Sequence, residues 1–375
     1  MRRGKVVPGV RNFMMVNDWK SYDFRNPVDL VAVEDDEPLF AAISSTAAFR
    51  RLADIRFLGG IDYLLVRTPN GAPGHRRYTR YQHSLGVARL AYLYGIIRDL
   101  SPAKRRLAYA AALLHDIGHA PLSHTLEGVF QKNFRINHHL AGVEIVTGRS
   151  PFGEEISAIL KQFGLDAEQV MSVAAGKDDE FEGFFGGPIN FDTIEGILRS
   201  WIYLRPKAPS LSPEEVMVAA MRRDSHSDRE TVDRFWEYKD NVYRYIIRSE
   251  FGVAADRICE LAAEASISNL SRNDYFLTER QLFKKIPDLR HFLLNFHTND
   301  SLGEGVGSGL QYQLRTFGVD TCHDFFARDD VGRYKQWKED RVMRAPELRP
   351  AVLCRPKFPD FFDDLSIRTN KIAIQ

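Results

Sequence analysis

The chain has 375 residues, of which 44% are hydrophobic, so it can bury at least one sizeable core and its length would permit two domains. Its 51 Lys and Arg residues nearly balance its 50 Asp and Glu residues, which excludes the strong overall positive charge of a dedicated nucleic-acid-binding protein. The three cysteines, Cys259, Cys322 and Cys354, lie far apart and form no C-x-x-C pair, which argues against a zinc ribbon and a disulfide scaffold.

The N-terminal stretch MRRGKVVPGVRNFMMVNDW begins with basic residues, but a proline and polar residues interrupt it before the apolar core of a signal peptide can form. No window reaches the roughly 18 apolar residues that a membrane span needs. We therefore expect a soluble, cytoplasmic protein without a membrane partner, and a homo-oligomer is compatible with the sequence. Two short strand-like pieces, LVAVE at 30–34 and DYLLVR at 62–67, predict a small β hairpin or edge near the N-terminus.

Most of the middle of the chain has the apolar spacing of α-helices, so the sequence predicts a mainly α fold. A broad apolar stripe begins near residue 83, and SPAKRRLAYAAALLHDIG at 101–118 offers a serine cap, a proline at the first helical position and a glycine near the stop. The acidic, glycine-rich segment 176–188 is predicted to be a loop or lid. Beyond about residue 300 the periodicity weakens, which predicts an irregular C-terminal region. Further helices are predicted at about 137–147, 152–163, 191–203, 212–222 and 228–265.

The stretch AALLHDIGHAPLSHT, residues 111–125, places three of the chain's 11 histidines within ten positions. His115 and Asp116 are expected at the end of an apolar helix. A carboxylate buried there needs a cation, an arginine or a metal, because leaving it unpaired costs several kcal/mol or forces its pKa upward. His119 follows four residues after His115 and lies on the same face if the helix continues that far.

Three other short patterns can complete a site around this stretch. RYQHSLG places His83 at the start of a buried helix, INHHLAG supplies His138 and His139, and NFDTIEG puts Asp192 at the start of another helix. Two histidines and two aspartates from three helices suit Zn, Mn, Fe or, with fewer histidines, Mg. A lone histidine or aspartate at a helix start is more often a cap than a ligand, so the spacing alone leaves a metal site and a structural role equally open.

Read together and in this order, RYQHSLGV, LLHDIGHAPLSHTLE, NHHLAGVEI and FDTIEG resemble the HD-domain metal-dependent phosphohydrolases, most nearly the deoxynucleoside triphosphate triphosphohydrolase branch with its dGTPases. The likeness covers roughly residues 14–290, with AFRRLADIRFLGGIDYLL leading into the first histidine. It implies an HD-domain helical bundle as the core at 51–290. An N-terminal segment at 1–50 would pack on this core, and 291–375 would form a C-terminal region of unknown role.

The resemblance also implies the roles of individual residues. The family's catalytic histidines fall on His124 and His138, with Glu127 as the carboxylate beside them. Arg80 matches an arginine that contacts substrate phosphate, and His119 matches a further active-site histidine on the substrate side. The family's four metal ligands fall on His83, His115, Asp116 and Asp192.

The chemistry implied by the resemblance agrees with these residue types. One divalent ion is expected, with Mn, Mg, Fe, Ni, Co and Zn as candidates, and a second ion is allowed. Such an ion lowers the pKa of a bound water and orients it toward phosphorus. His124 is placed to donate a proton to the leaving alkoxide, with Glu127 and His138 orienting or assisting it. The basic loop GHRRYTR supplies weaker candidates for contacting phosphate, namely His75, Arg76 and Arg77.

Substrate selection is where the chain departs from the triphosphohydrolase branch. Phe57 stands where that branch has a glutamine that helps to recognise the sugar; it is a candidate to stack on a base, although a core aromatic is the simpler interpretation. Thr193, Gly196 and Ser200 replace a lysine, a tyrosine and an aspartate of that branch. A site that has lost such polar groups loses discrimination. The expected partner is therefore a nucleotide or another phosphorylated small molecule, and nucleic acid is not indicated.

Two other functions stay open. Some HD-domain proteins are di-iron oxygenases, and His119, His124 and His138 are the available ligands for a second metal. A non-catalytic nucleotide sensor on the same scaffold is the other alternative, although the presence of every family ligand and both catalytic histidines argues against it. Two irons per chain and consumption of O₂ would distinguish the oxygenase.

Overall fold

The computed structural model describes residues 37–65, 78–181, 183–187, 189–204, 211–222, 225–248, 250–295, 310–312 and 349–351. Several predicted features lie outside these residues: the strand-like piece at 30–34, most of the N-terminal segment 1–50, the loop residues His75, Arg76 and Arg77, and most of the C-terminal region 291–375.

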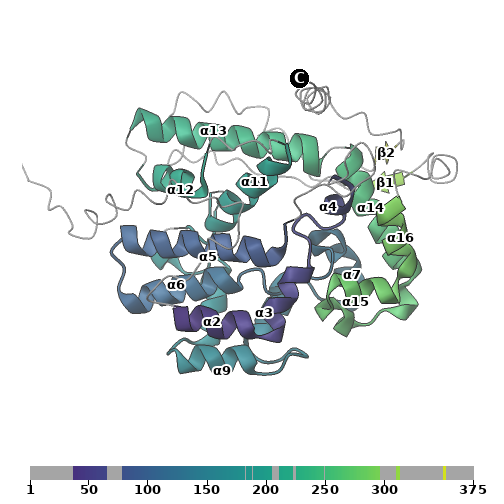
Figure 1. Cartoon of the computed structure of the whole chain (residues 1–375), viewed down its shortest axis with the longest axis horizontal. Helices are drawn as coiled ribbons and strands as arrows, with labels where there is room; N and C mark the ends of the chain where they lie inside the picture. The colour runs from purple at the N-terminus through teal and green to yellow at the C-terminus, as the bar shows by residue number, and fades with distance from the viewer. Residues whose placement is uncertain are drawn as a thin grey trace, which may run out of the picture.

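Helices dominate the described chain, which confirms the mainly α prediction (Figure 1). The α-helices, in chain order, are α2 (Glu37–Ser45), α3 (Ala47–Arg51), α4 (Gly60–Leu65), α5 (Arg80–Ile97), α6 (Pro102–Leu114), α7 (Glu127–Phe134), α8 (His138–Val146), α9 (Glu155–Gln162), α10 (Ala167–Ala174), α11 (Phe191–Leu204), α12 (Pro213–Arg222), α13 (His226–Val242), α14 (Glu250–Ala265), α15 (Glu279–Lys285) and α16 (Pro287–Asn295).

Shorter elements accompany these helices. Two strands, β1 (Leu310–Tyr312) and β2 (Arg349–Ala351), pair antiparallel, with Leu310 opposite Ala351. The 3₁₀ and π turns are η3 (Leu52–Asp54), η4 (Ser123–Thr125), η5 (Asp179–Phe181), the π-helical η6 (Tyr243–Ile247), η7 (Ile267–Asn269) and η8 (Arg272–Phe276).

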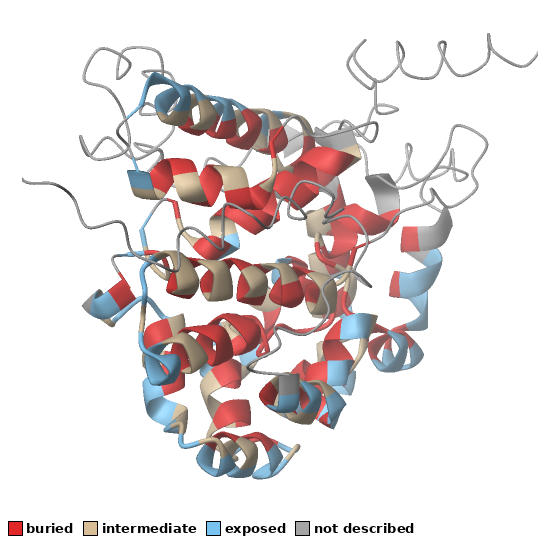
Figure 2. Ribbon diagram, turned by 60° about the vertical axis from the view of Figure 1, so that its left-hand side comes forward, coloured by how far each residue is buried: buried red, intermediate tan, exposed pale blue. Residues whose placement is uncertain are grey.

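The pair α5 and α6 occupies the middle of the molecule. Figure 1 shows α11, α12 and α13 on one side of this pair, α2, α3 and α9 on the other, and α14, α15 and α16 gathered at one end. Figure 2 shows that the buried residues face the interior, where α5 and α6 meet their neighbours. The seven consecutive residues Ala108–Leu114 of α6 are all buried, as an alanine-rich central helix requires.

Local signals set where the two central helices begin and end. Thr79 caps α5 through a capping box with Gln82, which places His83 in the first turn. Ser101 caps α6, with Pro102 at its first position as predicted. This helix ends at Leu114 with His115 as its C-cap, so it does not continue to His119 and the two histidines do not share a helix face.

Two other predicted elements need correction. The strand expected at 62–67 is the helix α4 through Leu65, which is stabilised where the Asp62 carboxylate accepts hydrogen bonds from the Leu58 amide and the Tyr203 hydroxyl. A short apolar run does not distinguish a buried helix from a strand. The single helix expected at 228–265 is divided into α13, η6 and α14. Apolar periodicity alone does not reveal this division.

Two glycines permit close backbone approaches around the end of α6. A Cβ on Gly118 would overlap the His138 carbonyl oxygen and the Gly142 amide, so α8 packs directly on this turn. Gly59, with φ +62°, packs against the Leu122 carbonyl. No helix in the described part of the chain is long and apolar enough to cross a membrane.

We expect Gly118→Ala to lower the free energy of unfolding by about 1–3 kcal/mol, because the added methyl forces two backbone segments apart. Urea unfolding followed by circular dichroism measures this change. Gly128→Ala is the matched control, since nothing lies within 4 Å of a Cβ added there. Alanine is favoured over glycine in a helix by about 0.5–1 kcal/mol, so this control should be neutral or stabilising. Equal destabilisation by both substitutions would contradict the close approach at Gly118.

Candidate metal and catalytic site

The four predicted metal ligands come together from three elements. His83 lies in the first turn of α5, His115 and Asp116 follow α6, and Asp192 lies in the first turn of α11. His83 Nε2 is 2.9 Å from Asp192 Oδ1, 3.4 Å from Asp116 Oδ2 and 3.3 Å from His115 Nε2. Asp192 is more than half exposed, so the cluster opens to solvent on that side.

Hydrogen bonds at the far side of each ring turn both histidines toward this cluster. His115 Nδ1 lies 2.7 Å from the Ala112 carbonyl oxygen, which only an N–H at Nδ1 satisfies. His83 Nδ1 faces the buried Glu195 carboxylate in the same way. The two Nε2 atoms therefore face each other together with two carboxylates, and this donor set fits a divalent transition-metal ion.

The charges in the cluster depend on one another. Burial alone would lower the pKa of His83, but the carboxylates of Glu195, Asp192 and Asp116 raise it to about 9. Burial alone would raise the pKa of Asp116, but His115, His119 and Arg80 hold it well below its ordinary value. The carboxylates are thus ionised, whereas His83 holds a proton that a bound metal ion would have to displace.

Arg80, predicted to contact substrate phosphate, is buried beside the cluster. Its Nη1 donates to Asp116 Oδ2 at 2.7 Å, its Nε to Ser123 Oγ at 2.7 Å and its Nη2 to the Phe57 carbonyl at 3.0 Å. These contacts engage three of the five N–H donors of a guanidinium. In this arrangement Arg80 neutralises Asp116 and retains donors for an anion.

A second group of histidines lies next to the first. His119, His124 and His138 each bring a ring nitrogen within 4.8 Å of the others. Glu127 joins two of them, because its Oε2 is 2.9 Å from His124 Nδ1 and its Oε1 is 2.5 Å from His138 Nδ1. Burial alone would raise the pKa of Glu127, but the hydrogen bonds from the two histidines outweigh it and hold the pKa well below its ordinary value.

His119 lies between the two groups. Its Nε2 is 3.0 Å from Asp116 Oδ1, and its ring stacks on that of His138 with the centroids 4.6 Å apart. Burial lowers the pKa of His119 well below its ordinary value, and nearby Arg80 lowers it further. A neutral imidazole at this position links the first group to the second.

The turn that carries His124 is held in an unusual backbone conformation. Leu122 and Ser123 have φ values of +61° and +50°, which side chains rarely adopt unless their surroundings hold them there. Ser123 Oγ donates to the Arg56 carbonyl, and Thr125 Oγ1 accepts from the Gly60 amide. These bonds offset the strain and fix the position of His124, whose side chain is 41% exposed.

Phe57 packs against the first group. Its ring lies 4.8 Å from that of His83 and under the guanidinium of Arg80, and only 6% of the residue is exposed. Gly196 leaves ordinary van der Waals room beside Phe57 and His83. Ser200 is buried and donates to the Gly196 carbonyl at 2.7 Å. Of the three positions that depart from the triphosphohydrolase branch in α11, Ser200 thus turns its hydroxyl back onto its own helix.

Sequence reasoning assigned no role to three charged residues that support the site. Arg51, at the end of α3, donates to the Ile117 and His119 carbonyls at 2.7 Å each and so fixes the turn after α6. Glu195 and Arg199 lie behind His83. The spacing of Asp192, Glu195 and Arg199 at i, i+3 and i+7 on one helix is the signal that could have drawn attention to this pair.

Residues 80–176 match the family model of the HD domain. Deoxynucleoside triphosphate triphosphohydrolase SAMHD1 of Gallus gallus is 30% identical over 51% of this chain and 31% of its own length. Uncharacterized protein MG461 of Mycoplasma genitalium is 32% identical over 38% of this chain and 33% of its own length. Uncharacterized protein YwfO of Bacillus subtilis is 28% identical over 48% of this chain and 40% of its own length. The chain thus spans about a third of the length of these curated relatives.

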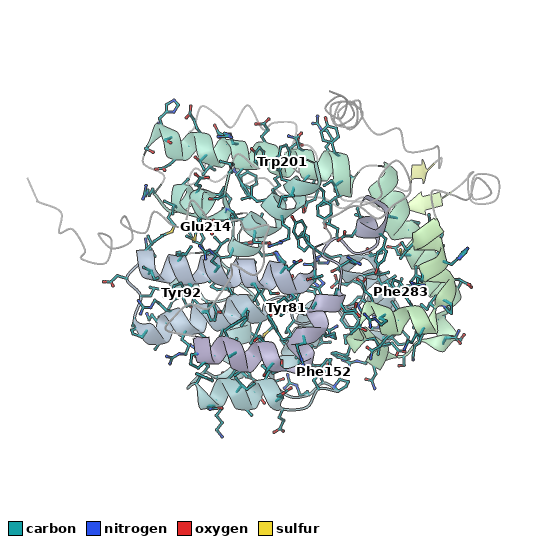
Figure 3. The ribbon with its side chains drawn as sticks, viewed as in Figure 1. Tyr81, Tyr92, Phe152, Trp201, Glu214 and Phe283 are labelled. Carbon is teal, nitrogen blue, oxygen red and sulfur yellow. The ribbon has the colours of Figure 1, made fainter. Side chains whose placement is uncertain are left out.

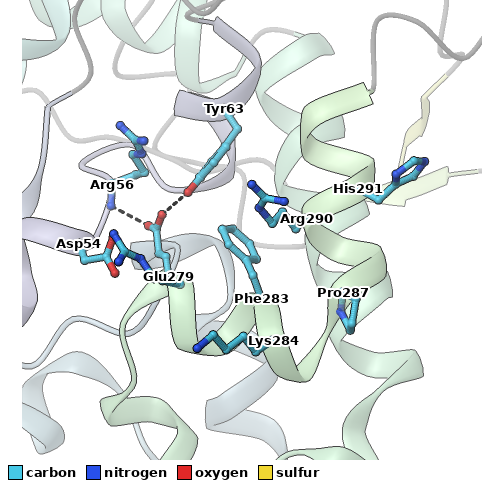
Figure 4. Close-up of a pocket in the computed structure, with 10 residues that line it drawn as sticks. Asp54, Arg56, Tyr63, Glu279, Phe283, Lys284, Pro287, Arg290 and His291 are labelled. Atoms are coloured by element: carbon cyan, nitrogen blue, oxygen red, sulfur yellow. Dashed lines mark hydrogen bonds between the residues drawn. The ribbon is translucent and has the colours of Figure 1, made fainter.

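A cavity of about 790 Å³ lies between the Arg56 segment and helices α15 and α16 (Figure 4). None of the predicted ligands or catalytic residues lines it. Its connection to the site is Glu279, whose carboxylate accepts from the Arg56 amide at 2.6 Å, the Tyr63 hydroxyl and the Leu122 amide at 3.3 Å. Glu279 therefore supports the strained turn next to His124 from the side of the cavity. Four basic residues of the lining are Arg56, Arg280, Lys284 and Arg290.

Glu279 is predicted to make the stability of the protein depend on pH. Burial raises the pKa of Glu279 to about 7, so the folded protein holds a proton there that the unfolded chain releases at lower pH. The folded state should therefore lose stability as the pH rises from about 5 through 7.

Chemical denaturation at several pH values, of the wild type and of Glu279→Gln, measures this dependence. The free energy of unfolding of the wild type relative to the variant should fall by up to about 3 kcal/mol between about pH 5 and pH 8, since one pKa unit corresponds to about 1.4 kcal/mol. Parallel pH profiles for the two proteins would show that Glu279 does not titrate in this range.

Proposed function

We propose that this chain, which carries an HD domain over residues 80–176, is a metal-dependent phosphohydrolase that acts on a nucleotide or a related phosphoester. The observation that carries the proposal is the convergence of His83, His115, Asp116 and Asp192, with ligand atoms that face one another across 2.9–3.9 Å. Beside this cluster lies the second group of histidines, whose side chains are able to move protons. Glu127 joins two of them, His124 and His138.

The proposed metal ligands are two imidazoles and two carboxylates. This mixture of donors suits Mn, Fe, Co, Ni or Zn, and Mg less well because Mg prefers oxygen. A divalent ion bound there supplies Lewis acidity and an activated water for attack on phosphorus. Asp192 is the most exposed of the four ligands, which favours approach of the substrate from its side.

The second group supplies the proposed proton donor. His124 is the most exposed member of the group, and its Nδ1 is directed to Glu127. We propose that Nε2 of His124, the nitrogen not directed to Glu127, donates a proton to the oxygen of the leaving group. Glu127 also accepts from His138 Nδ1, so one carboxylate orients both catalytic histidines.

Arg80, His119 and Phe57 are proposed to border the substrate. Arg80 has donors left for a phosphate oxygen, and guanidinium groups bind phosphate in bidentate geometry. His119 is buried between the two groups, which favours a contact with the reacting phosphate rather than with an exposed part of the substrate. Phe57 has most of its ring against His83 and Arg80, so base stacking would use only its edge.

A nucleotide is the proposed substrate class. The relatives named deoxynucleoside triphosphate triphosphohydrolase support it, and they make a deoxynucleoside triphosphate one candidate. Phe57, Thr193, Gly196 and Ser200 differ from the sugar-reading and phosphate-reading residues of that branch. We therefore include nucleoside monophosphates and other phosphoesters in the proposal. The catalytic unit is proposed to be residues 51–290.

One alternative has a specific observation in its favour. His119, His124 and His138 are close enough to hold a second ion, and Asp116 lies 3.0 Å from His119 between the two groups. A di-iron oxygenase needs such a second site. The non-catalytic sensor has no comparable support, since both groups retain all of their predicted members.

The experiment that tests the proposal uses the purified chain with Mn²⁺, Mg²⁺, Co²⁺ or Ni²⁺. It is incubated with deoxynucleoside and ribonucleoside triphosphates, mononucleotides and cyclic dinucleotides, and the phosphate species released are identified. Release of triphosphate supports the triphosphohydrolase branch, and release of inorganic phosphate supports another phosphoesterase. Binding of metal without turnover of any compound supports the sensor, and consumption of O₂ with two irons supports the oxygenase.

We expect His124→Ala to lower turnover by about 10²–10⁴, because general acid catalysis contributes this much, while bound metal is retained. Initial rates and metal content by inductively coupled plasma mass spectrometry check both parts. His226→Ala is the control, since this histidine of α13 is 78% exposed and pairs only with Glu230 of its own helix among the described residues. Near-normal turnover of His124→Ala would remove His124 from the mechanism.

A second variant tests the metal ligands. His115→Ala should lose most of its bound metal, because it removes one of the two nitrogen ligands and leaves two carboxylates facing one histidine. The same metal analysis applies, again with His226→Ala as the control. Metal content equal to that of the wild type would exclude His115 as a ligand.

A further inference from the structure

The side chain of His83 is fully buried, and each of its ring nitrogens has a polar partner. Nε2 faces the cluster of proposed ligands, where Asp192 Oδ1 is 2.9 Å away. Nδ1 faces the opposite direction, toward Oε2 of Glu195 in the next turn of the same helix as Asp192. The ring thus connects the cluster on one side to a second carboxylate on the other.

Glu195 is held in place by an arginine that lies one turn further along α11. Arg199 Nε donates to Glu195 Oε1 at 2.8 Å, and Arg199 Nη2 contacts the same oxygen. Both residues are about 1% exposed. Arg199 also donates to the Gln82 carbonyl at 3.3 Å, which ties it to the first turn of α5 beside His83. The charge of the buried carboxylate is therefore balanced without help from His83.

The surroundings are shaped around this pair. A Cβ on Gly86, one turn after His83 on α5, would overlap Glu195 Oε1. The guanidinium of Arg199 lies over the ring of Tyr78, 4.8 Å from its centroid. Glycine at position 86 makes room for the carboxylate, and the Tyr78 ring covers the arginine from the other side.

We infer that Glu195, clamped by Arg199, is a positioning residue for the metal site: it accepts a hydrogen bond from Nδ1–H of His83 and so keeps Nε2, the nitrogen that would bind the metal, turned toward Asp192, Asp116 and His115. The inference rests on the proposed function, since Glu195 and Arg199 act on the metal site only if His83 is a metal ligand. Glu195 does not touch the metal or the substrate in this scheme. It acts by fixing the tautomer and the orientation of one ligand.

A purely structural role would have a different signature. If Glu195 only filled space in the core, its replacement would lower stability and leave the affinity for metal unchanged. Partners of this kind behind a metal-binding histidine typically account for about 10–100-fold in metal affinity. The measurement that separates the two roles is therefore the dissociation constant for the metal alone.

The test uses Glu195→Gln in the full chain, with Mn²⁺ as the probe. The amide keeps the size of the side chain but replaces one acceptor oxygen with a donor, so it cannot serve His83 and Arg199 together. We expect the dissociation constant for Mn²⁺, measured from the electron paramagnetic resonance signal of free Mn²⁺, to rise about 10–100-fold. Thermal unfolding in the presence of a chelator records the structural cost separately.

Glu214→Gln is the matched control. Glu214 (Figure 3) is also buried, lies on α12, which packs on α5 as α11 does, and accepts from an arginine, Arg89 Nε, at 2.9 Å. This substitution should change the affinity for Mn²⁺ by less than about threefold while costing a similar amount of stability. A loss of affinity as large as that of Glu195→Gln would overturn the inference.

The remaining outcomes separate this inference from the proposed function. If the wild type binds Mn²⁺ and Glu195→Gln binds it within about threefold, the positioning role is overturned and the metal site stands. If the wild type binds no Mn²⁺, the metal site itself fails and the inference with it. If Glu195→Gln does not fold, Arg199→Gln replaces it, because the carboxylate stays but loses its clamp. An unchanged dissociation constant for that variant also overturns the inference.

Discussion

The rest of the site is arranged around one buried charge, the carboxylate of Asp116. A carboxylate at that depth is stable only when positive charge and hydrogen-bond donors surround it, because burial otherwise costs several kcal/mol. Arg80 meets this need at 2.7 Å, with His119 and His115 on the other oxygen. These partners come from α5 and from the turn after α6, so the ends of two helices have to meet at Asp116.

The same turn separates two kinds of chemistry over a short distance. The histidines of the first group have their Nδ1 atoms engaged behind them and are suited to binding a cation. In the second group, Glu127 joins His124 and His138, which are suited to moving a proton. The left-handed backbone at Leu122 and Ser123 is what redirects the chain from one group to the other. Strain of this kind persists only where neighbouring contacts hold it, as Gly59 and Glu279 do here.

Apolar periodicity and capping residues are local signals, and they predicted the helical class. The grouping of the histidine motifs into one site came instead from the family resemblance, because their spacing alone left a structural role equally open. The sequence placed the end of α6 near His115 and Asp116 but left open whether the helix continues to His119, and the structure ends it at Leu114. The close packing of α8 on Gly118 is a tertiary contact that the sequence did not predict. Strand and buried helix also look alike over a run as short as 62–67. Arg51 and Glu279 escaped notice since their partners lie on other elements, and tertiary contacts of this kind leave no periodic mark. Glu195 left a local signal in its spacing to Arg199, but its contact with His83 joins two helices.

The contact between Gly86 and Glu195 limits which residues related chains can carry at these two positions. The space that the carboxylate occupies is the space that any side chain at position 86 would fill. In related chains the two positions are therefore not independent, because a residue larger than glycine at 86 requires a shorter one at 195. A single substitution at either position alone leaves the core overpacked or with a cavity. Each single step is unfavourable alone, so the pair should persist or change as a unit through descent.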